Sequence, residues 1–386
     1  MLAEERIHPV AIDPETTLVA VVELSGSSWM IAGQIPGVDR MPKRNVEPSA
    51  AAVRTTLEAW TRRAMARGRM VRRTVLAYEI GRDGFWLARL LQAEGIEVHI
   101  IQPASVAVDR RARRAKTDAI DLDLLMRTLL AWLRGEPRVC SMVPVPSVED
   151  EDARRPGRER QDLLKVRLAI ENRIGSLLMT LGIRGYAPAR RDRWERLESL
   201  RTPQGALLPP HAKAQIKRGL VQLELVLGQI AELEAQRDAV LDKPTADNKA
   251  DAMIQALCQL RAVGPETATL LVREAFSRPI RGPKALGSYA GLTGSPWASG
   301  GMAREQGISK AGNALLRKTL VQLAWVWLRF QPDSTLARWF TERTAGANKR
   351  MRKIMAVALA RKLLLALWRF AKDGVLPEGA VLKAAA

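Results

Sequence analysis

Four acidic residues in the first third of the chain have types and spacing that suit metal-ion chemistry. Glu23 ends the apolar run VAVVE, and Glu79 ends the run TVLAYE. Asp118 and Asp121 are three residues apart in KTDAID, which places both on one face of a helix. Carboxylates at two strand ends, faced by a helix with two more, can hold a pair of divalent cations that act on a phosphodiester. Oxygen ligands alone select Mg²⁺ or Mn²⁺ over zinc.

Each of these acids also has a simpler explanation. A carboxylate at the end of a strand is more often a solvated turn residue, and Asp118 can cap the N-terminus of its helix. Basic residues lie directly before Asp118, and their contacts with the acids can be ordinary salt bridges. Asp13, Asp83 and Asp109 are other acids that compete for the same role. The four acids therefore predict a metal site only when they are taken together.

The elements that must position these acids alternate between strands and helices. We predict two strands within residues 17–31, and further strands at TVLAYE and IEVHIIQP. Helices are predicted over EPSAAAVRTTLEAWTRRAMARG, over DGFWLARLLQAEG and from Asp118 onward. Such alternation is typical of an α/β sheet with helices on its faces. The fold class is therefore expected to be α/β plus α, with an α/β domain over residues 1–143.

Two long helical patterns lie in residues 144–250, after a Pro-rich and densely charged segment, 144–160, that we interpret as a linker. The apolar stripes of these helices are Leu163, Ile170, Ile174, Leu177 and Leu181, and Ile216, Leu220, Leu223, Leu227 and Ile230. The second stripe has the alternating steps of four and three that characterise a coiled coil. The pattern favours a dimerising arm slightly over two helices that pack within one chain.

The charge of the chain indicates its partner. The 386 residues carry 61 Lys and Arg against 41 Asp and Glu, a net charge of +20. The last quarter, 281–386, has 18 basic and 5 acidic residues. A second basic cluster consists of Arg110, Arg111, Arg113, Arg114 and Lys116. A folded chain with this excess is expected to bind nucleic acid, and a basic surface without that role is the alternative.

Composition excludes several other classes of protein. The two cysteines cannot form a disulfide framework, and the three histidines have no partner at zinc-ligand spacing. The N-terminus lacks the apolar core of a signal peptide, and the most apolar C-terminal run, 354–370, contains Arg361 and Lys362. We therefore expect an intracellular, soluble protein without a membrane partner.

The segment AYEIGRDGFWLARLLQAEGIEVHIIQPASVAVDRRARRAKTDAIDLDLL resembles the signature of the DEDD transposases of insertion-sequence family 110. The resemblance implies an RuvC-like RNase H fold whose acidic tetrad binds Mg²⁺, or Mn²⁺ in its place. Three members of the tetrad map onto Glu79, Asp118 and Asp121. The family usually has an aspartate in the first position, where VVELSGSSW offers Glu23. Asp13 is the alternative, and Glu23 is favoured because the residues after it match the family better.

Residues 251–386, expected to be mainly helical, resemble the transposase domain of the same family in LGSYAGLTGSPWASGGMAREQGISKAGNALLRKTLVQLAWVWLR. The matching serine is Ser299, which the resemblance identifies as the nucleophile and which is otherwise an ordinary turn residue. A serine hydroxyl needs an activating group, and the metal cluster is the natural one because no histidine is available. The basic residues that can contact neighbouring phosphates are Lys310, Arg317 and Lys318.

The resemblance implies a DNA transposase or recombinase that forms a covalent phosphoserine link to DNA. It further implies a dimer or tetramer, a structured non-coding (bridge) RNA that selects donor and target DNA, and a place with the nucleoid in the bacterial cytoplasm. Two alternatives stay open on the sequence. One is a metal-dependent, structure-specific nuclease that uses the acids and water. The other is a non-catalytic nucleic-acid scaffold whose acids are surface charges.

Overall fold

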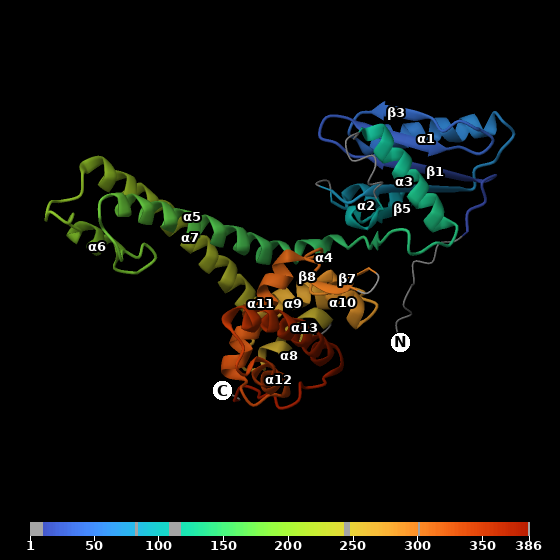
Figure 1. Ribbon diagram of the computed structural model, residues 1–386. Helices are drawn as coiled ribbons and strands as arrows, with labels where there is room; N and C mark the ends of the chain where they lie inside the picture. The colour runs from blue at the N-terminus through green and yellow to red at the C-terminus, as the bar shows by residue number, and fades with distance from the viewer. Residues whose placement is uncertain (1–10, 82–83, 108–116, 243–247, 300–301, 385–386) are drawn as a thin grey trace. The chain divides into compact units, whose positions relative to one another are not determined.

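The computed structural model describes residues 11–81, 84–107, 117–242, 248–299 and 302–384 (Figure 1). The chain divides into two compact units, Met1–Ser147 and Val148–Ala386. The first is a mixed sheet with helices on both faces, and the second is mainly helical. The predicted α/β plus α class is therefore confirmed. Among the described residues, no helix has both the length and the apolar character that a membrane span requires.

The sheet of the first unit has six strands among the described residues, in the order β3-β2-β1-β4-β5-β6. Their bounds are Thr17–Glu23 (β1), Trp29–Gln34 (β2), Lys43–Val46 (β3), Arg73–Glu79 (β4), Glu97–Ile101 (β5) and Met142–Val143 (β6). Strands β1, β4 and β5 are parallel, β2 is antiparallel to both β1 and β3, and β6 is antiparallel to β5. The strands predicted at 17–31, TVLAYE and IEVHIIQP are confirmed. Strands β3 and β6 were not predicted, because KRNV is polar and MV is too short to show a pattern.

Helices cover both faces of this sheet, as its alternating side chains require. Leu18, Ala20 and Val22 of β1 pack with α1 (Ala50–Met65) and α2 (Trp86–Ala93). Val19 and Val21 point to the other face and pack with α3 (Asp118–Leu133). A short 3₁₀ turn, Pro103–Ser105, follows β5. The three predicted helices of this unit are confirmed. The candidate metal-binding acids belong to the face of the sheet that α3 covers.

Glu97, at the start of β5, makes stability of the first unit depend on pH. Burial raises the pKa of Glu97, but hydrogen bonds from His99 and Arg73 outweigh it and lower that pKa from 4.5 to about 2. Arg73 donates from Nε (2.8 Å) and Nη2 (2.9 Å), and His99 Nε2 lies 2.7 Å from Oε1. A lowered carboxyl pKa stabilises the fold above about pH 4.5, and this contribution is lost as the pH falls toward 2.

We therefore expect the melting temperature of the wild type to exceed that of Glu97→Gln above pH 4.5. The difference should shrink between pH 4.5 and pH 2, because protonation removes the charge that the variant lacks. Circular dichroism melts of the two intact chains over this range measure it. A difference that does not change with pH would contradict the assignment.

The second unit is built of helices and one β-hairpin. Its helices are α4 (Val148–Asp152), α5 (Arg155–Thr180), α6 (Arg193–Ser199), α7 (Pro210–Asp242), α8 (Lys249–Cys258), α9 (Pro265–Leu271), α10 (Pro283–Tyr289), α11 (Ala314–Phe330), α12 (Thr335–Thr344) and α13 (Lys349–Asp373). A five-residue π-helical turn, η3 (Val272–Phe276), continues α9. The hairpin consists of β7 (Gly294–Ser299) and β8 (Met302–Ile308). The segment interpreted as a linker is partly helical, since α4 and the first turns of α5 occupy it.

Helices α5 and α7 form a long helical hairpin with α6 at its tip (Figure 1). Ile170, Ile174 and Leu178 of α5 are buried with the apolar stripe of α7, which includes Leu220 and Leu223. The predicted stripes therefore cover each other within one chain. This is the packing that the sequence favoured less, and the stripe needs no second chain to bury it.

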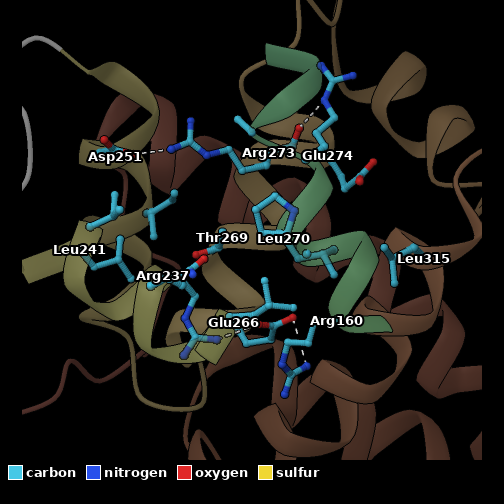
Figure 2. A pocket seen from close by; sticks show the side chains of 18 residues that line it. Arg160, Arg237, Leu241, Asp251, Glu266, Thr269, Leu270, Arg273, Glu274 and Leu315 are labelled. Carbon is cyan, nitrogen blue, oxygen red and sulfur yellow. Dashed lines mark hydrogen bonds and ion pairs between the residues drawn. The ribbon is translucent and has the colours of Figure 1, made fainter. Parts of the chain in front are cut away.

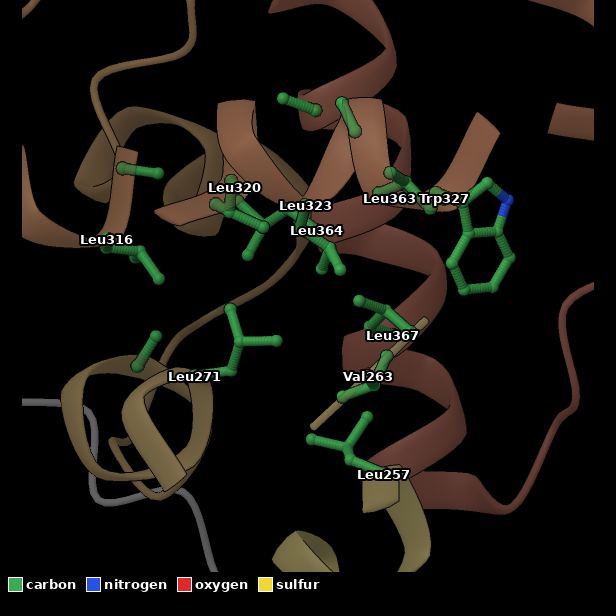
Figure 3. Close-up of a cluster of buried hydrophobic side chains, with 14 of the residues drawn as sticks. Leu257, Val263, Leu271, Leu316, Leu320, Leu323, Trp327, Leu363, Leu364 and Leu367 are labelled. Carbon is green, nitrogen blue, oxygen red and sulfur yellow. The ribbon is translucent and has the colours of Figure 1, made fainter. Parts of the chain in front are cut away.

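The remaining helices of the second unit enclose its largest apolar core. Leu257 of α8, Leu271 of α9, Leu320 of α11 and Leu364 of α13 are each fully buried in it (Figure 3). Trp327 also lies in this core, where its indole nitrogen donates to Ser334 Oγ at 2.9 Å. Leu316, in the first turn of α11, is buried in this core, and five residues separate the end of the β7–β8 hairpin from the start of α11.

Candidate active site

The structure brings Glu23 and Glu79 to the same edge of the sheet. Each is the last residue of its strand, and the paired residues Val22 and Tyr78 directly precede them in neighbouring parallel strands. Both glutamates are half-buried. They follow Val21 and Ala77 by two residues, and those two pack on the α3 face. The two positions therefore lie side by side on the face of the sheet that α3 covers.

Asp118 and Asp121 occupy the first turn of α3. Thr117 caps this helix, since its Oγ1 accepts a hydrogen bond from Ile120 N at 3.4 Å. The alternative that Asp118 is the cap is therefore wrong. Leu122 and Leu125, one turn further along, are buried against the sheet. The acids thus begin the helix that packs over the face shared by the two glutamates.

Lys43 of β3 holds the start of α3 against the sheet. Its Nζ donates to the carbonyl oxygen of Ala119 at 2.9 Å and to Asp123 Oδ2 at 2.7 Å. Ala119 lies between the two candidate aspartates, so this contact fixes the turn that carries them. Asp123 is thereby assigned to a salt bridge, which distinguishes it from Asp118 and Asp121.

Asp13, the alternative to Glu23, has a different role in the structure. Its Oδ1 accepts from Glu15 N (3.0 Å) and its Oδ2 accepts from Thr16 Oγ1 (2.8 Å), and the Thr16 bond is the main reason that its pKa is lowered. Asp13 therefore organises the turn before β1. Since Glu23 is at the far end of that strand, the two carboxyl groups lie at opposite edges of the sheet. Asp83 and Asp109 lie outside the described residues.

The four acids are not gathered into a closed metal cage. Among the described residues, no three His, Cys, Asp or Glu side chains come together as a group that could hold a metal ion. Two features suit a hard divalent cation. All the candidate donors are carboxylate oxygens, and the two strand ends are adjacent. The metal site is therefore a proposal that rests on placement and donor type.

Ser299 is the last residue of β7 and pairs with Met302, the first residue of β8. It belongs to a two-stranded hairpin rather than to a helix. Two apolar side chains near Ser299 are exposed, Trp297 at 42% and Met302 at 67%. Isolated two-stranded hairpins have little stability of their own, so the base of this one must be anchored.

Backbone contacts anchor the base of the hairpin. Ser309 N donates to Thr293 O at 2.9 Å, and Asn313 N donates to Tyr289 O at 2.7 Å. Gly312 has φ +92°, and a Cβ there would lie 2.2 Å from Tyr289 O. Only glycine allows the two segments to approach so closely. The motif GISKAGN is thus the clasp that holds the hairpin to α10.

The predicted phosphate contacts divide into two groups. Lys310 and Lys318 are exposed, and Lys318 Nζ lies 3.4 Å from Gln161 Oε1. Arg317 instead donates from Nη1 to Ala290 O at 3.2 Å, which gives it a part in the clasp. The predicted basic cluster Arg110, Arg111, Arg113, Arg114 and Lys116 lies outside the described residues.

A buried polar network behind the hairpin was not predicted from the sequence. Glu274, only 3% exposed, lies on η3 and receives two hydrogen bonds from Arg158 of α5, at 2.8 and 3.0 Å. Asn313 Nδ2 donates to Glu274 Oε2 at 2.7 Å, while its Oδ1 caps α11 at Leu316 N. The network connects the helical hairpin to the clasp. No spacing in the sequence signals it, because Arg158 lies 116 residues before Glu274 and Asn313 lies 39 residues after it.

Comparison with known proteins places these features in a family. Residues 254–339 match the family described as "Transposase IS116/IS110/IS902 family". A Sinorhizobium fredii protein named "Putative transposase y4rJ" is 46% identical over 99% of this chain and 99% of its own length. "Probable family 20 transposase" of Pseudomonas aeruginosa is 28% identical, covering 75% and 80%. "Transposase for insertion sequence element IS1328" of Yersinia enterocolitica is 26% identical, covering 78% and 84%.

Proposed function

Because this chain belongs to the IS116/IS110/IS902 family of transposases, we propose that it cuts and rejoins DNA with Ser299 as the nucleophile. A divalent metal ion, Mg²⁺ or Mn²⁺, would be held by Glu23, Glu79, Asp118 and Asp121. The observation that carries this proposal is the position of the two glutamates at neighbouring parallel strand ends, on the face covered by the helix that begins with the two aspartates.

The fold of the first unit supports the RuvC-like assignment. A mixed sheet in the order β3-β2-β1-β4-β5, with helices on both faces, is compatible with an RNase H fold. In open sheets with parallel strands, functional groups gather at the carboxyl ends of those strands. Glu23 and Glu79 lie at such ends, whereas Asp13 does not.

The chemistry assigned to Ser299 is transesterification. Its Oγ would form a bond to phosphorus, and the bond from phosphorus to the leaving deoxyribose oxygen would break. The serine proton is released, and the leaving oxygen takes one up, so the number of phosphodiester bonds is conserved. A free DNA hydroxyl would then reverse the exchange and release the serine. When bound at the acids, the metal ion would neutralise phosphate charge and favour the deprotonated hydroxyl.

The nucleic-acid partners follow from charge and family. DNA is the partner that transposition requires, and the net charge of +20 suits a polyanion. The structured bridge RNA is a proposal that comes from the family resemblance. The exposed Trp297 and Met302 support the hairpin as a surface that a partner covers, since apolar side chains gain nothing from water.

The serine and the acids belong to different units of the chain. We expect the serine of one protomer to act together with the acids of another protomer in a dimer or tetramer. Cells that carry a marked insertion element, its RNA and the wild-type protein should show transposition. Ser299→Ala alone and Asp118→Asn alone should not, whereas co-expression of both variants should restore part of the activity, because one assembled site is then intact.

Two outcomes of this experiment would contradict the proposal. If the wild-type protein does not move the element, the proposed function is wrong. If the wild type is active but the mixed variants stay inactive, the serine and the acids act within one protomer. Equal expression of each variant, verified by immunoblot, is the control.

A further inference from the structure

A cavity of about 280 Å³ lies at the base of the helical hairpin, between α5, α7, α8 and α9. Arg160, Glu266 and Arg237 lie at one end, and Arg273, Asp251 and Glu274 lie at the other (Figure 2). Apolar side chains such as Leu241, Leu270 and Leu315 form much of the wall between them. Nothing in the proposed reaction uses this cavity.

Arg154 also lines the cavity, and it differs from the other arginines there in its lack of an ion-pair partner among the described residues. Arg160, Arg237 and Arg273 each form an ion pair, with Glu234 at 2.6 Å, Glu266 at 2.8 Å and Asp251 at 2.5 Å respectively. Arg154 is only 8% exposed, yet within the described part of the chain it forms no ion pair. Among the described residues, its guanidinium group makes one hydrogen bond, from Nε to Arg273 O at 3.1 Å.

The surroundings of Arg154 hold more positive than negative charge. Burial lowers the pKa of Arg154, and the nearby Arg278 lowers it further, while Glu274 opposes them. Glu274 is already occupied, because it accepts two hydrogen bonds from Arg158 and one from Asn313. Arg278 directs Nη1 to the hydroxyl of Tyr289 at 3.3 Å. The main charges that act on Arg154 are therefore the guanidinium groups of Arg278 and Arg158 and the single carboxylate of Glu274.

A buried cation without a counter-ion costs stability, and the cost is removed when an anion binds. A guanidinium group matches a phosphate with two parallel hydrogen bonds. Arg154 is also the N-cap residue of α5, a helix of 26 residues whose N-terminus attracts negative charge. Glu274 and Asn313 connect this cluster to the clasp of the Ser299 hairpin.

We propose that Arg154, supported by Arg158 and Arg278, binds a backbone phosphate of the DNA substrate. The assignment rests on the proposed function, because that function makes DNA the polyanion that this unit must hold near its hairpin. The cluster is a positioning site and takes no part in bond making or breaking. It would hold the strand through a phosphate other than the one that Ser299 attacks.

Arg154→Met in the full-length Ser299→Ala protein tests the proposal without strand cleavage. We expect an unchanged or higher melting temperature, because methionine removes a buried charge and keeps much of the volume. Binding to a fluorescein-labelled 30-base-pair duplex should weaken about five- to tenfold near physiological salt. The logarithm of the association constant falls with log[NaCl], and the magnitude of this slope should decrease by about one, as expected when one phosphate contact is lost. Fluorescence anisotropy over a range of NaCl measures both.

Arg160→Met is the matched control, because Arg160 lies on the same helix and lines the same cavity but is paired with Glu234 and Glu266. It should lower the melting temperature and leave the salt slope unchanged. Arg154→Lys keeps a cation and should retain most of the slope. Arg154→Met should change the salt slope without lowering the melting temperature, and Arg160→Met should do the reverse. This contrast separates phosphate binding from a structural role.

Three results would overturn the proposal. Arg154→Met could lower the melting temperature and leave the salt slope unchanged, which would make Arg154 structural. Inorganic phosphate alone could raise the melting temperature of the parent but not of Arg154→Met, with DNA binding equal in both, which would indicate a free-anion site. A slope change seen with single-stranded RNA and not with the DNA duplex would assign the cluster to RNA. Because the background lacks Ser299, none of these results depends on whether the serine is the nucleophile.

Discussion

Replacement of Ser299 by alanine is expected to abolish formation of a covalent protein–DNA adduct. The proposed adduct is an ester of this hydroxyl, and no other group of the side chain can form it. Loss of an enzyme's nucleophile lowers the rate on the order of 10⁴-fold or more. Electrophoresis under denaturing conditions measures the adduct as protease-sensitive retardation of labelled DNA. DNA binding in anisotropy should be unchanged.

Ser295→Ala and Ser309→Ala are the matched controls for this prediction. Ser295 lies on the same strand, and Ser309 directly follows β8, where its backbone N–H anchors the hairpin. Both variants should keep the adduct, because neither hydroxyl is assigned to the chemistry. If Ser299→Ala still cuts DNA without attachment, the protein is a hydrolytic nuclease that uses the acids and water.

The double variant Asp118→Asn/Asp121→Asn is expected to lose metal-dependent strand cleavage on the order of 10³-fold, because metal-ion stabilisation of the reacting phosphate is worth several kcal/mol. Asparagine keeps the shape of each side chain but removes the charge that attracts the cation. Initial cleavage rates over a range of Mg²⁺ concentration measure the loss. The wild type should show a rising, saturating response that the variant lacks.

Asp123→Asn is the control on the same helix, since Asp123 is paired with Lys43 and should affect stability alone. Glu23→Gln and Asp13→Asn compare the two candidates for the first metal ligand. We expect loss of activity with Glu23→Gln and retention with Asp13→Asn, because Asp13 closes a turn at the opposite edge of the sheet. Wild-type activity and an unchanged Mg²⁺ response in the double aspartate variant would make the acids surface charges, as in a scaffold.

The sheet of the first unit could be predicted because its strands are apolar and its helices are amphipathic. Residues 17–23 of β1 are almost entirely buried, so their sequence shows little besides β-branched and small apolar residues. The positions of Glu23 and Glu79 followed, since each is the glutamate that ends the apolar run of its strand. Strand β3 could not be predicted, because KRNV is polar and mostly exposed, and its place in the sheet depends on pairing with β2 and on the contact of Lys43 with α3.

The second unit shows where local patterns are insufficient. The stripes of α5 and α7 were visible in the sequence, but a stripe does not identify what covers it, and here each covers the other. The β7–β8 hairpin has no alternating pattern, and its stability depends on distant contacts such as that between Asn313 and Tyr289. The unpaired charge of Arg154 emerges only in three dimensions, since its neighbour Glu274 lies 120 positions away.

The candidate site was predicted as a set of residues rather than as a geometry. Sequence and fold agree that Glu23 and Glu79 end adjacent strands and that Asp118 and Asp121 begin the helix opposite. Ser299 came from the family resemblance, because a serine before two glycines is by itself an ordinary turn. The sequence alone does not specify which chain supplies the serine to which acids, since this depends on assembly.

The most direct test of the central claim identifies the atom that is joined to DNA. Protein, element-derived RNA and element DNA are incubated with Mg²⁺, digested with protease and nuclease, and the linked peptide is sequenced by mass spectrometry. We predict a nucleotide phosphate on Ser299 that appears with the wild type and disappears with EDTA or with Asp118→Asn/Asp121→Asn. A nucleotide on another residue, or cleaved DNA ends that carry no peptide, would contradict the account.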